Sequence, residues 1–239
     1  MGYPNNRLIR ISRHTLDPLP TPEMVPRNSQ KNQSCVILGG GPSLKLVNPS
    51  VWKEYFTIGV NKALMLPNVN AMYFMDRRLY DMCIGGHTDE YEDREMKAAW
   101  KSFTGPKYVL RTNKSLKFNS DVVVVPRYVK PVISYDVNAG IYGATNSGAG
   151  AIMLAIALGY TKINLLGYDL NIAIDGKTTH WHKGYLRQVA SQTKKKLHNF
   201  KNDFQKIEDL LKGSDIEVFN LNLNSEINNF PKIRIDSVL

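Results

Sequence analysis

The stretch from Gly143 to Asp169, GATNSGAGAIMLAIALGYTKINLLGYD, decides the fold of this 239-residue chain. Asn146 is a residue type that caps helix N-termini, and residues 152–158 are apolar on nearly every side, as expected of a helix packed within a sheet protein. Gly159 ends this helix, and the apolar run INLLG predicts a buried strand. Asp169 follows the carboxyl end of that strand, where open α/β sheets bind their ligands.

The same alternation of strand and helix signals covers the chain from residue 34 onward. Further apolar runs predict strands at 35–38, 56–61, 71–76, 107–110, 121–127 and 216–221. A period of three and four predicts one long amphipathic helix from Leu186 to Leu211, and shorter helices are predicted from Ser43, at 93–101 and at 224–230. We therefore predict an α/β protein with a Rossmann-like, doubly wound, mostly parallel sheet, in a single domain at 34–239.

Residues 1–33 differ in composition from this domain. They are rich in Pro, Asn and Arg without periodicity, which predicts an extended basic N-terminal arm. The whole chain has a formal net charge of +10, which favours polyanionic partners such as nucleic acid, a membrane surface or phosphorylated substrates, although solubility alone also explains it. The sequence contains no zinc-finger, RNA-binding or basic-zipper signature.

Hydropathy and cysteine usage indicate the compartment in which the protein is expected to work. No apolar run approaches the roughly 18 to 20 residues that span a bilayer, and the first residues lack a signal-peptide core. We therefore expect no membrane partner and a cytoplasmic protein, in the host cytoplasm if the chain is phage-encoded. Cys35 and Cys83 are isolated thiols without metal-ligand spacing, so both are expected to be reduced and structural.

A glycine turn joins the first predicted strand to the segment that begins at Ser43. Residues without a Cβ let backbone N–H groups face an anion, so the turn supplies four candidate donor-binding residues, Gly39, Gly40, Gly41 and Ser43. The turn does not match the GxGxxG dinucleotide fingerprint, which would need Gly at Leu44, and it is not a Walker motif.

Other strand ends and turns add candidates for the same crevice. Asn61 and Asp76 end two predicted strands and are candidates for binding a sugar or a base, although such residues also form turns. A second small-residue turn, at Asn146, Ser147 and Gly148, comes before the buried helix. Two turns that aim N–H groups into one crevice suit a nucleotide phosphate better than a neutral metabolite.

At these motifs the chain resembles a known group of enzymes. The segments 36–44 (VILGGGPSL), 59–63 (GVNKA), 146–169 and 218–225 (VFNLNLNS) look like the bacterial sialyltransferases of glycosyltransferase family 42. They also look like the related domain of phage proteins and of a 6-hydroxymethylpterin pyrophosphokinase; the phage-type relatives share a His-aromatic-His after GYD. The resemblance covers roughly residues 34 to 230 and implies a Rossmann-like fold, a nucleotide donor in the crevice and no obligatory metal.

Carried over position by position, the resemblance implies donor-binding roles. Asn61 matches the family's nucleotide-contacting Asn, and Ser147 with Gly148 matches its Ser-Gly pair. Gly167 and Asp169 match the Gly-x-Asp that holds the ribose or base.

Four positions depart from the family pattern. Gly40 stands where the family has an Asn on the donor, and Asp76 stands where an Asn is usual. Asn146 replaces a Thr, and Ala144 replaces an Arg that helps to bind the donor. These departures leave the sugar open.

The resemblance also implies a catalytic His, for which the chain offers three candidates. Ungapped spacing back from the last predicted strand leads to His198, inside the long helix. His180 and His182 lie in the loop after Asp169, where a base must come within about 3 Å of an acceptor hydroxyl. The ordinary His pKa near ~6.5 suits that proton transfer at neutral pH. As metal ligands the pair lacks a clear third partner, so no metal site is predicted.

Together these observations predict a glycosyltransferase that moves a sugar from a nucleotide-activated donor to a hydroxyl acceptor, with no metal or other cofactor. The basic charge and the phage-type resemblance make hydroxylated bases in DNA a candidate acceptor. Two alternatives stay open. One is a Mg-dependent pyrophosphokinase or nucleotidyl transferase, for which Asp76 and Asp169 are the candidate carboxylates. The other is a non-catalytic nucleotide-binding protein.

Overall fold

The computed structural model describes residues 33–84, 91–112, 117–170, 180–181 and 187–238, without the side chains of 91–93 and 187–198. Residues 1–32 of the predicted N-terminal arm and His182 lie outside the described residues, and so does the side chain of His198. The strands are β1 (Ser34–Leu38), β2 (Phe56–Val60), β3 (Ala71–Phe74), β4 (Lys107–Leu110), β5 (Val123–Val125), β6 (Arg127–Tyr128), β7 (Ile141–Tyr142), β8 (Lys162–Leu166) and β9 (Glu217–Asn220). The α-helices are α1 (Arg77–Ile84), α2 (Tyr91–Ser102), α3 (Ser147–Ala157) and α4 (Arg187–Leu211).

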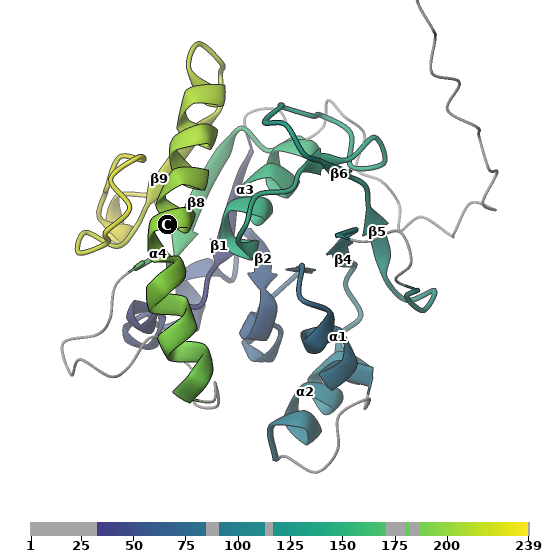
Figure 1. Ribbon diagram of the computed structural model, residues 1–239. Coiled ribbons are helices and arrows are strands. Elements are labelled where there is room, and N and C mark those ends of the chain that lie inside the picture. Colours follow the sequence, from purple (N-terminus) through teal and green to yellow (C-terminus); the bar gives the residue numbers. More distant parts are fainter. Residues whose placement is uncertain (1–32, 85–90, 113–116, 171–179, 182–186, 239) are drawn as a thin grey trace, which may run out of the picture.

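Seven strands form one parallel sheet in the order β5-β4-β3-β2-β1-β8-β9, and β6 pairs with β7 separately. The chain winds outward from β1 to β5 and then returns to place β8 on the other side of β1. The winding direction therefore reverses between β1 and β8, which is where ligands bind in open α/β sheets. This architecture confirms the predicted Rossmann-like, doubly wound fold (Figure 1).

Both faces of the sheet are covered, because the central strands are apolar on both sides. In β1, Cys35 and Ile37 belong to the cluster that includes α3 and α4, which lie in front of the sheet in Figure 1. Val36 and Leu38 face the opposite side and pack with short 3₁₀ segments. Helix α3 is buried over nearly its whole length, which explains why its sequence lacks a polar face.

Three short segments differ from the sequence-based prediction. The residues after Gly41 form the 3₁₀ helix η1 (Pro42–Leu46), and α1 has no counterpart among the predicted helices. The helix predicted at 224–230 is wrong, since these residues are not helical. There Asn222 Oδ1 accepts from the N–H of Asn224, and Ser225 Oγ accepts from the N–H of Ile227, so side chains take the backbone donors that a helix would need.

Candidate functional site

The glycine turn after β1 is bonded to the end of β8. The Gly39 N–H donates to the Leu166 carbonyl at 2.7 Å, and the Gly41 N–H donates to the Gly167 carbonyl at 2.8 Å. Gly167 has a φ of +70°, a conformation that favours glycine. The turn and the Gly-x-Asp motif therefore form one continuous frame at the β1/β8 switch point.

The Asp169 carboxylate holds these segments together through three hydrogen bonds. Its Oδ2 accepts from Ser43 Oγ at 2.9 Å, and its Oδ1 accepts from the Ser43 N–H at 3.2 Å and from Asn222 Nδ2 at 2.7 Å. Burial raises the pKa of Asp169, while these hydrogen bonds act in the opposite direction. Asp169 is only 4% exposed, so it joins the segments that follow β1, β8 and β9 rather than projecting into solvent.

Three backbone donors at the glycine turn are used within the chain. The N–H groups of Gly39 and Gly41 bond to carbonyls, and that of Ser43 bonds to Asp169. Sequence reasoning expected these N–H groups to face a ligand anion; the structure directs them to the chain's own acceptors. A carboxylate already stands at the start of η1.

The N-terminus of α3 also uses acceptors from the chain's own side chains. Asn146 caps the helix, with its Oδ1 accepting from the Ala149 N–H at 2.8 Å. The buried Asp203 carboxylate of α4 accepts from the Thr145 N–H at 2.6 Å and from Asn146 Nδ2 at 3.3 Å. A carboxylate near a helix N-terminus is stabilised by the same partial positive charge that would attract a phosphate.

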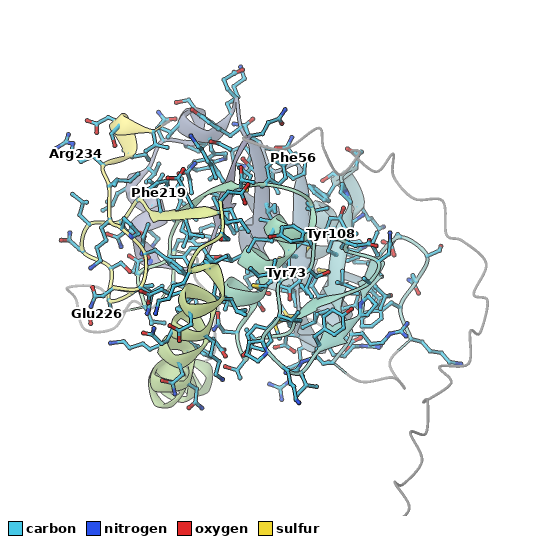
Figure 2. The ribbon with its side chains drawn as sticks, turned by 90° about the horizontal axis from the view of Figure 1, so that it is seen from above. Phe56, Tyr73, Tyr108, Phe219, Glu226 and Arg234 are labelled. Carbon is cyan, nitrogen blue, oxygen red and sulfur yellow. The ribbon has the colours of Figure 1, made fainter. Side chains whose placement is uncertain are left out.

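The small residues of α3 make room for aromatic rings. A Cβ on Gly148 would lie 3.1 Å from the Tyr168 ring, and the Tyr168 hydroxyl donates to the Gly148 carbonyl at 2.9 Å. A Cβ on Gly150 would overlap the hydroxyl of Tyr73, which lies against α3 in Figure 2. Ser147 and Gly148 are partly buried at this helix start. Close packing thus accounts for the small residues that the sequence presents as an open turn.

Asn61, directly after β2, carries two unusual features together. It has a φ of +55°, which a residue with a side chain rarely adopts, and its buried Oδ1 has no hydrogen-bond partner among the described residues. Each feature costs on the order of 1–3 kcal/mol. Strain and an unsatisfied acceptor at one residue of the carboxyl edge of the sheet make Asn61 a candidate ligand contact.

Lys62 follows Asn61 directly in the chain. Lys62 is only 4% exposed, although lysine is almost never buried, and its charge acts on the His180 imidazole. Burial, and secondly Lys62, lower the pKa of His180 to about 4, so the imidazole is neutral at pH 7.

The glycine turn positions His180. The Trp181 N–H donates to the Gly40 carbonyl at 3.0 Å, and a Cβ on Gly40 would lie 3.2 Å from the His180 ring. Gly40 therefore allows the imidazole to lie directly on the turn. Leu38 pairs with Gly59 across β1 and β2, so Gly40 and Asn61 leave their strands at the same level of the sheet.

The remaining predicted site residues lie elsewhere or outside the described residues. Asp76 is exposed and caps α1, with its Oδ1 accepting from the Arg78 N–H at 2.9 Å. His198 belongs to α4, but its side chain is not described, and His182 is not described at all. Within the described residues, no group of three or more His, Cys, Asp or Glu side chains is placed to hold a metal ion. No helix in the described ranges is long and apolar enough to cross a membrane.

Sequence reasoning missed Lys62, Asn222 and Asp203. Lys62 was available as the residue after Asn61, but its burial is a tertiary property. Asn222 lies in the VFNLNLNS motif, whose role depends on the position of Asp169. Asp203 sits on an amphipathic helix, where nothing local separates a buried carboxylate from solvated ones.

No protein-family model and no curated protein matches the chain. Two solved structures are similar to it. Monomeric CstII is 19% identical, with 82% of this chain and 84% of that chain covered and a TM-score of 0.49. The sialyltransferase CstII from Campylobacter jejuni, in complex with the substrate analogue CMP-3FNeuAc, is 16% identical, with 84% of each chain covered and a TM-score of 0.46. At this level of similarity neither structure carries weight for function, which rests on the chain's own residues.

Proposed function

We propose that the protein is a glycosyltransferase that moves a sugar from a nucleotide-activated donor to a hydroxyl acceptor. The observation that carries this proposal is Asn61, with its left-handed backbone and its buried Oδ1 unpartnered among the described residues, at the carboxyl end of β2 next to the buried Lys62. An acceptor oxygen is satisfied by a ligand hydroxyl or amine, as on a ribose or a base, and a buried cation suits a phosphate. The sequence motifs that resemble family 42 support the same ligand.

In the proposed reaction His180 removes the proton of the acceptor hydroxyl. The hydroxyl oxygen then bonds to the anomeric carbon of the sugar, and the bond from that carbon to the phosphate oxygen breaks with its electron pair remaining on the phosphate. A neutral imidazole can accept this proton, and His180 is neutral at pH 7. Gly39, Gly41, Ser43, Gly167 and Asp169 would form the frame beneath, and Gly40 would give His180 its place.

For the acceptor we propose hydroxylated bases in DNA. The support is the net charge of +10 and the phage-type sequence resemblance. Binding that neutralises several DNA phosphates should weaken steeply and log-linearly with salt, by about 10³-fold or more between 50 and 200 mM for six contacts. Turnover on a small soluble acceptor at a rate independent of salt would contradict DNA as the acceptor.

Thermal shift with a panel of CMP, UDP, GDP, ADP and their sugars, with and without Mg²⁺, tests the donor. A nucleotide at 100-fold its Kd should add about 2.7 kcal/mol to the free energy of unfolding. We expect stabilisation by one nucleotide family without Mg²⁺. No stabilisation by any nucleotide would refute the proposal, and strict Mg²⁺ dependence would favour the pyrophosphokinase or nucleotidyl transferase instead.

Two asparagines with left-handed backbones provide a matched test of the site. Asn61→Gly removes both the strain and the unsatisfied oxygen, so it should stabilise the free protein while abolishing nucleotide stabilisation. Asn68 has a φ of +59° but is exposed, so Asn68→Gly should relieve strain and leave nucleotide binding unchanged. Equal nucleotide affinity in both variants would exclude Asn61 from the donor site.

His180→Gln should abolish turnover of the donor but retain donor binding. The control is His87→Gln, in the segment between α1 and α2, which should leave turnover unchanged. If His180→Gln turned over the donor at an unchanged rate, His180 would not be the base, and His182 and His198 would be the remaining candidates.

A further inference from the structure

The carboxyl edge of the sheet carries exposed basic residues beyond β3, β4 and β5. Arg78 follows β3 on α1, Arg111 directly follows β4, and Arg127 comes two residues after β5. Lys130 lies in the loop that follows β6. All four residues are exposed, and none of them forms an ion pair with a carboxylate of the described residues. We call these four residues the basic row.

The register of the sheet places the origins of the row side by side. Phe74 pairs with Val109, and Leu110 pairs with Val125, so β3, β4 and β5 end at nearly the same level. The Arg111 N–H donates to the Val125 carbonyl at 2.9 Å, which fixes Arg111 next to the end of β5. Because neighbouring strands lie about 4.8 Å apart, the three strand ends span roughly 10 Å.

The row adjoins the candidate site on two sides. Val60 pairs with Tyr73, so Asn61 leaves β2 one strand away from the end of β3. On the other side, Arg127 Nε donates to the Gly143 carbonyl at 3.0 Å, and the Arg127 side chain fills the space that a Cβ on Gly143 would need. Gly143 precedes the turn into α3. A ligand that lies along the row would therefore reach the edge of the sheet where Asn61 stands.

The carboxylates of the same segments do not pair with the row. The acidic residues among 75–78, 111–112 and 126–138 are Asp76 and Asp136. Each of these carboxylates accepts a backbone N–H two residues further along the chain. This part of the edge therefore presents a net positive charge, which attracts a polyanion.

The loop after β6 exposes large hydrophobic side chains next to the row. Tyr128, Val129, Val132 and Tyr135 are four of the seven large hydrophobic residues that are exposed within the described ranges. Tyr128 is 39% exposed and stands directly between Arg127 in the chain and Val129, which is 82% exposed. Exposed hydrophobic side chains that gather at one place indicate an interaction surface. A tyrosine ring offers a flat face on which a base can stack.

This combination favours single-stranded nucleic acid over the other polyanions. Basic residues at successive strand ends suit a chain of phosphates, and an exposed tyrosine suits an unpaired base, whereas the bases of a duplex already stack on each other. Lipid surfaces are bound by a continuous apolar face with basic residues along it. Here the apolar side chains are confined to one loop, and the row extends beyond them to β3.

We propose that the basic row and Tyr128 bind single-stranded DNA, with phosphates on the row and a base stacked on Tyr128. This inference rests on the proposed function, and it deepens that function by naming the surface that holds the acceptor strand. It also states the form of the acceptor, because chemistry on a base requires that the base be outside the duplex stack.

Fluorescence anisotropy of the full chain with a labelled oligothymidylate of about 20 nucleotides tests the surface. The logarithm of the association constant should fall linearly with the logarithm of the salt concentration, with a slope of about −0.7 for each phosphate contact. The same strand in a duplex should bind more weakly. Absence of binding at about 50 mM salt, or binding of the duplex as tight as that of the single strand, would overturn the proposal. Binding to phosphatidylserine vesicles without binding to the oligonucleotide would overturn it in favour of a lipid surface.

Substitutions in the row and in the loop should have different signatures. Arg111→Gln and Lys130→Gln should each make the salt slope shallower by about 0.7, because each removes one phosphate contact. Tyr128→Ala should weaken binding about fivefold or more without changing the slope, and Tyr128→Phe should keep the native affinity. Lys53→Gln removes the same charge from an exposed position just before β2, at the opposite edge of the sheet, and should change neither quantity.

The control variant decides between a defined surface and net charge alone. If Lys53→Gln changed the slope as much as Arg111→Gln, the effect would come from net charge and the proposal would be overturned. Native affinity in Tyr128→Ala would also overturn it. If Tyr128→Ala does not fold, the salt slopes of Arg111→Gln and Lys130→Gln still decide the question.

The two proposals fail in distinguishable ways. If the oligonucleotide binds through the row but no nucleotide sugar is turned over, the nucleic-acid surface stands and the transferase proposal falls. If a donor is turned over on a small acceptor while the oligonucleotide does not bind, the transferase stands and the nucleic-acid surface falls.

Discussion

Replacement of Gly41 by Ala tests the hydrogen bonds that Asp169 makes with Ser43 and Asn222. Backbone conformation alone predicts that this replacement stabilises the protein, whereas the packing around Gly41 predicts that it destabilises the protein. Gly41 has φ −71° and ψ 153°, which alanine adopts without strain. Gly→Ala at such a position ordinarily stabilises by about 0.4–1 kcal/mol, since it restricts the unfolded chain. Here the new Cβ would overlap Asp169 Oδ2 and would lie 2.6 Å from the Gly167 carbonyl oxygen.

The expected cost follows from the contacts that Asp169 must give up. Its displacement removes acceptors from the Ser43 N–H, Ser43 Oγ and Asn222 Nδ2. Each buried donor left unpaired costs about 1–3 kcal/mol, and rehydration of the displaced carboxylate offsets part of the sum. We therefore expect Gly41→Ala to lower the free energy of unfolding by about 3 to 5 kcal/mol.

Urea denaturation measures this change, with Gly213→Ala as the control. Gly213 has a φ of +79° and open space around it, so its substitution should cost only the backbone strain, about 1 kcal/mol. In an Asp169→Ala background the Gly41→Ala cost should shrink by at least about 1 kcal/mol, leaving the Gly167 contact. The reasoning would be refuted if Gly41→Ala left the free energy of unfolding unchanged or raised it. It would also be refuted if the effects of Gly41→Ala and Asp169→Ala on that free energy were strictly additive.

Three further predictions concern charge and packing. The unfolded His180 protonates near its ordinary pKa of 6.5, whereas the folded one stays neutral down to about 4, so stability present above 6.5 is lost as the pH falls through this window. The loss is at most about 3 kcal/mol and should be smaller in His180→Gln, as measured by urea midpoints from pH 7.5 to 4.5. Asp203→Ala should cost about 2–4 kcal/mol, because Thr145 and Asn146 lose their acceptor, and equal melting temperatures of variant and native protein would contradict this. Gly150→Ala should destabilise through overlap with the Tyr73 hydroxyl, and the cost should fall in a Tyr73→Phe background; a cost unchanged by Tyr73→Phe would assign it to another contact.

Much of the candidate site could be predicted from the sequence because strand ends and turns carry local signals. Gly40, Asn61 and Asp169 each follow an apolar run, and parallel strands bring such ends to one edge. His180 was identified as a loop residue after Asp169, although its contact with Gly40 involves positions 140 residues apart. The sequence did not show that the glycines at 148 and 150 pack against Tyr168 and Tyr73, because those rings come from distant segments.

The sequence by itself determined the alternation of strands and helices, the burial of α3 and the end of the long helix at Leu211. These follow from periodicity, capping and glycine conformation, which act over a few residues. Only the tertiary structure decided which polar groups meet. Asp169 and Asp203 became internal partners of helix starts, and Lys62 became buried where its charge lowers the pKa of His180. Burial and pairing depend on residues far apart in the chain. No local pattern therefore distinguishes a carboxylate that accepts hydrogen bonds within the fold from one that binds a ligand.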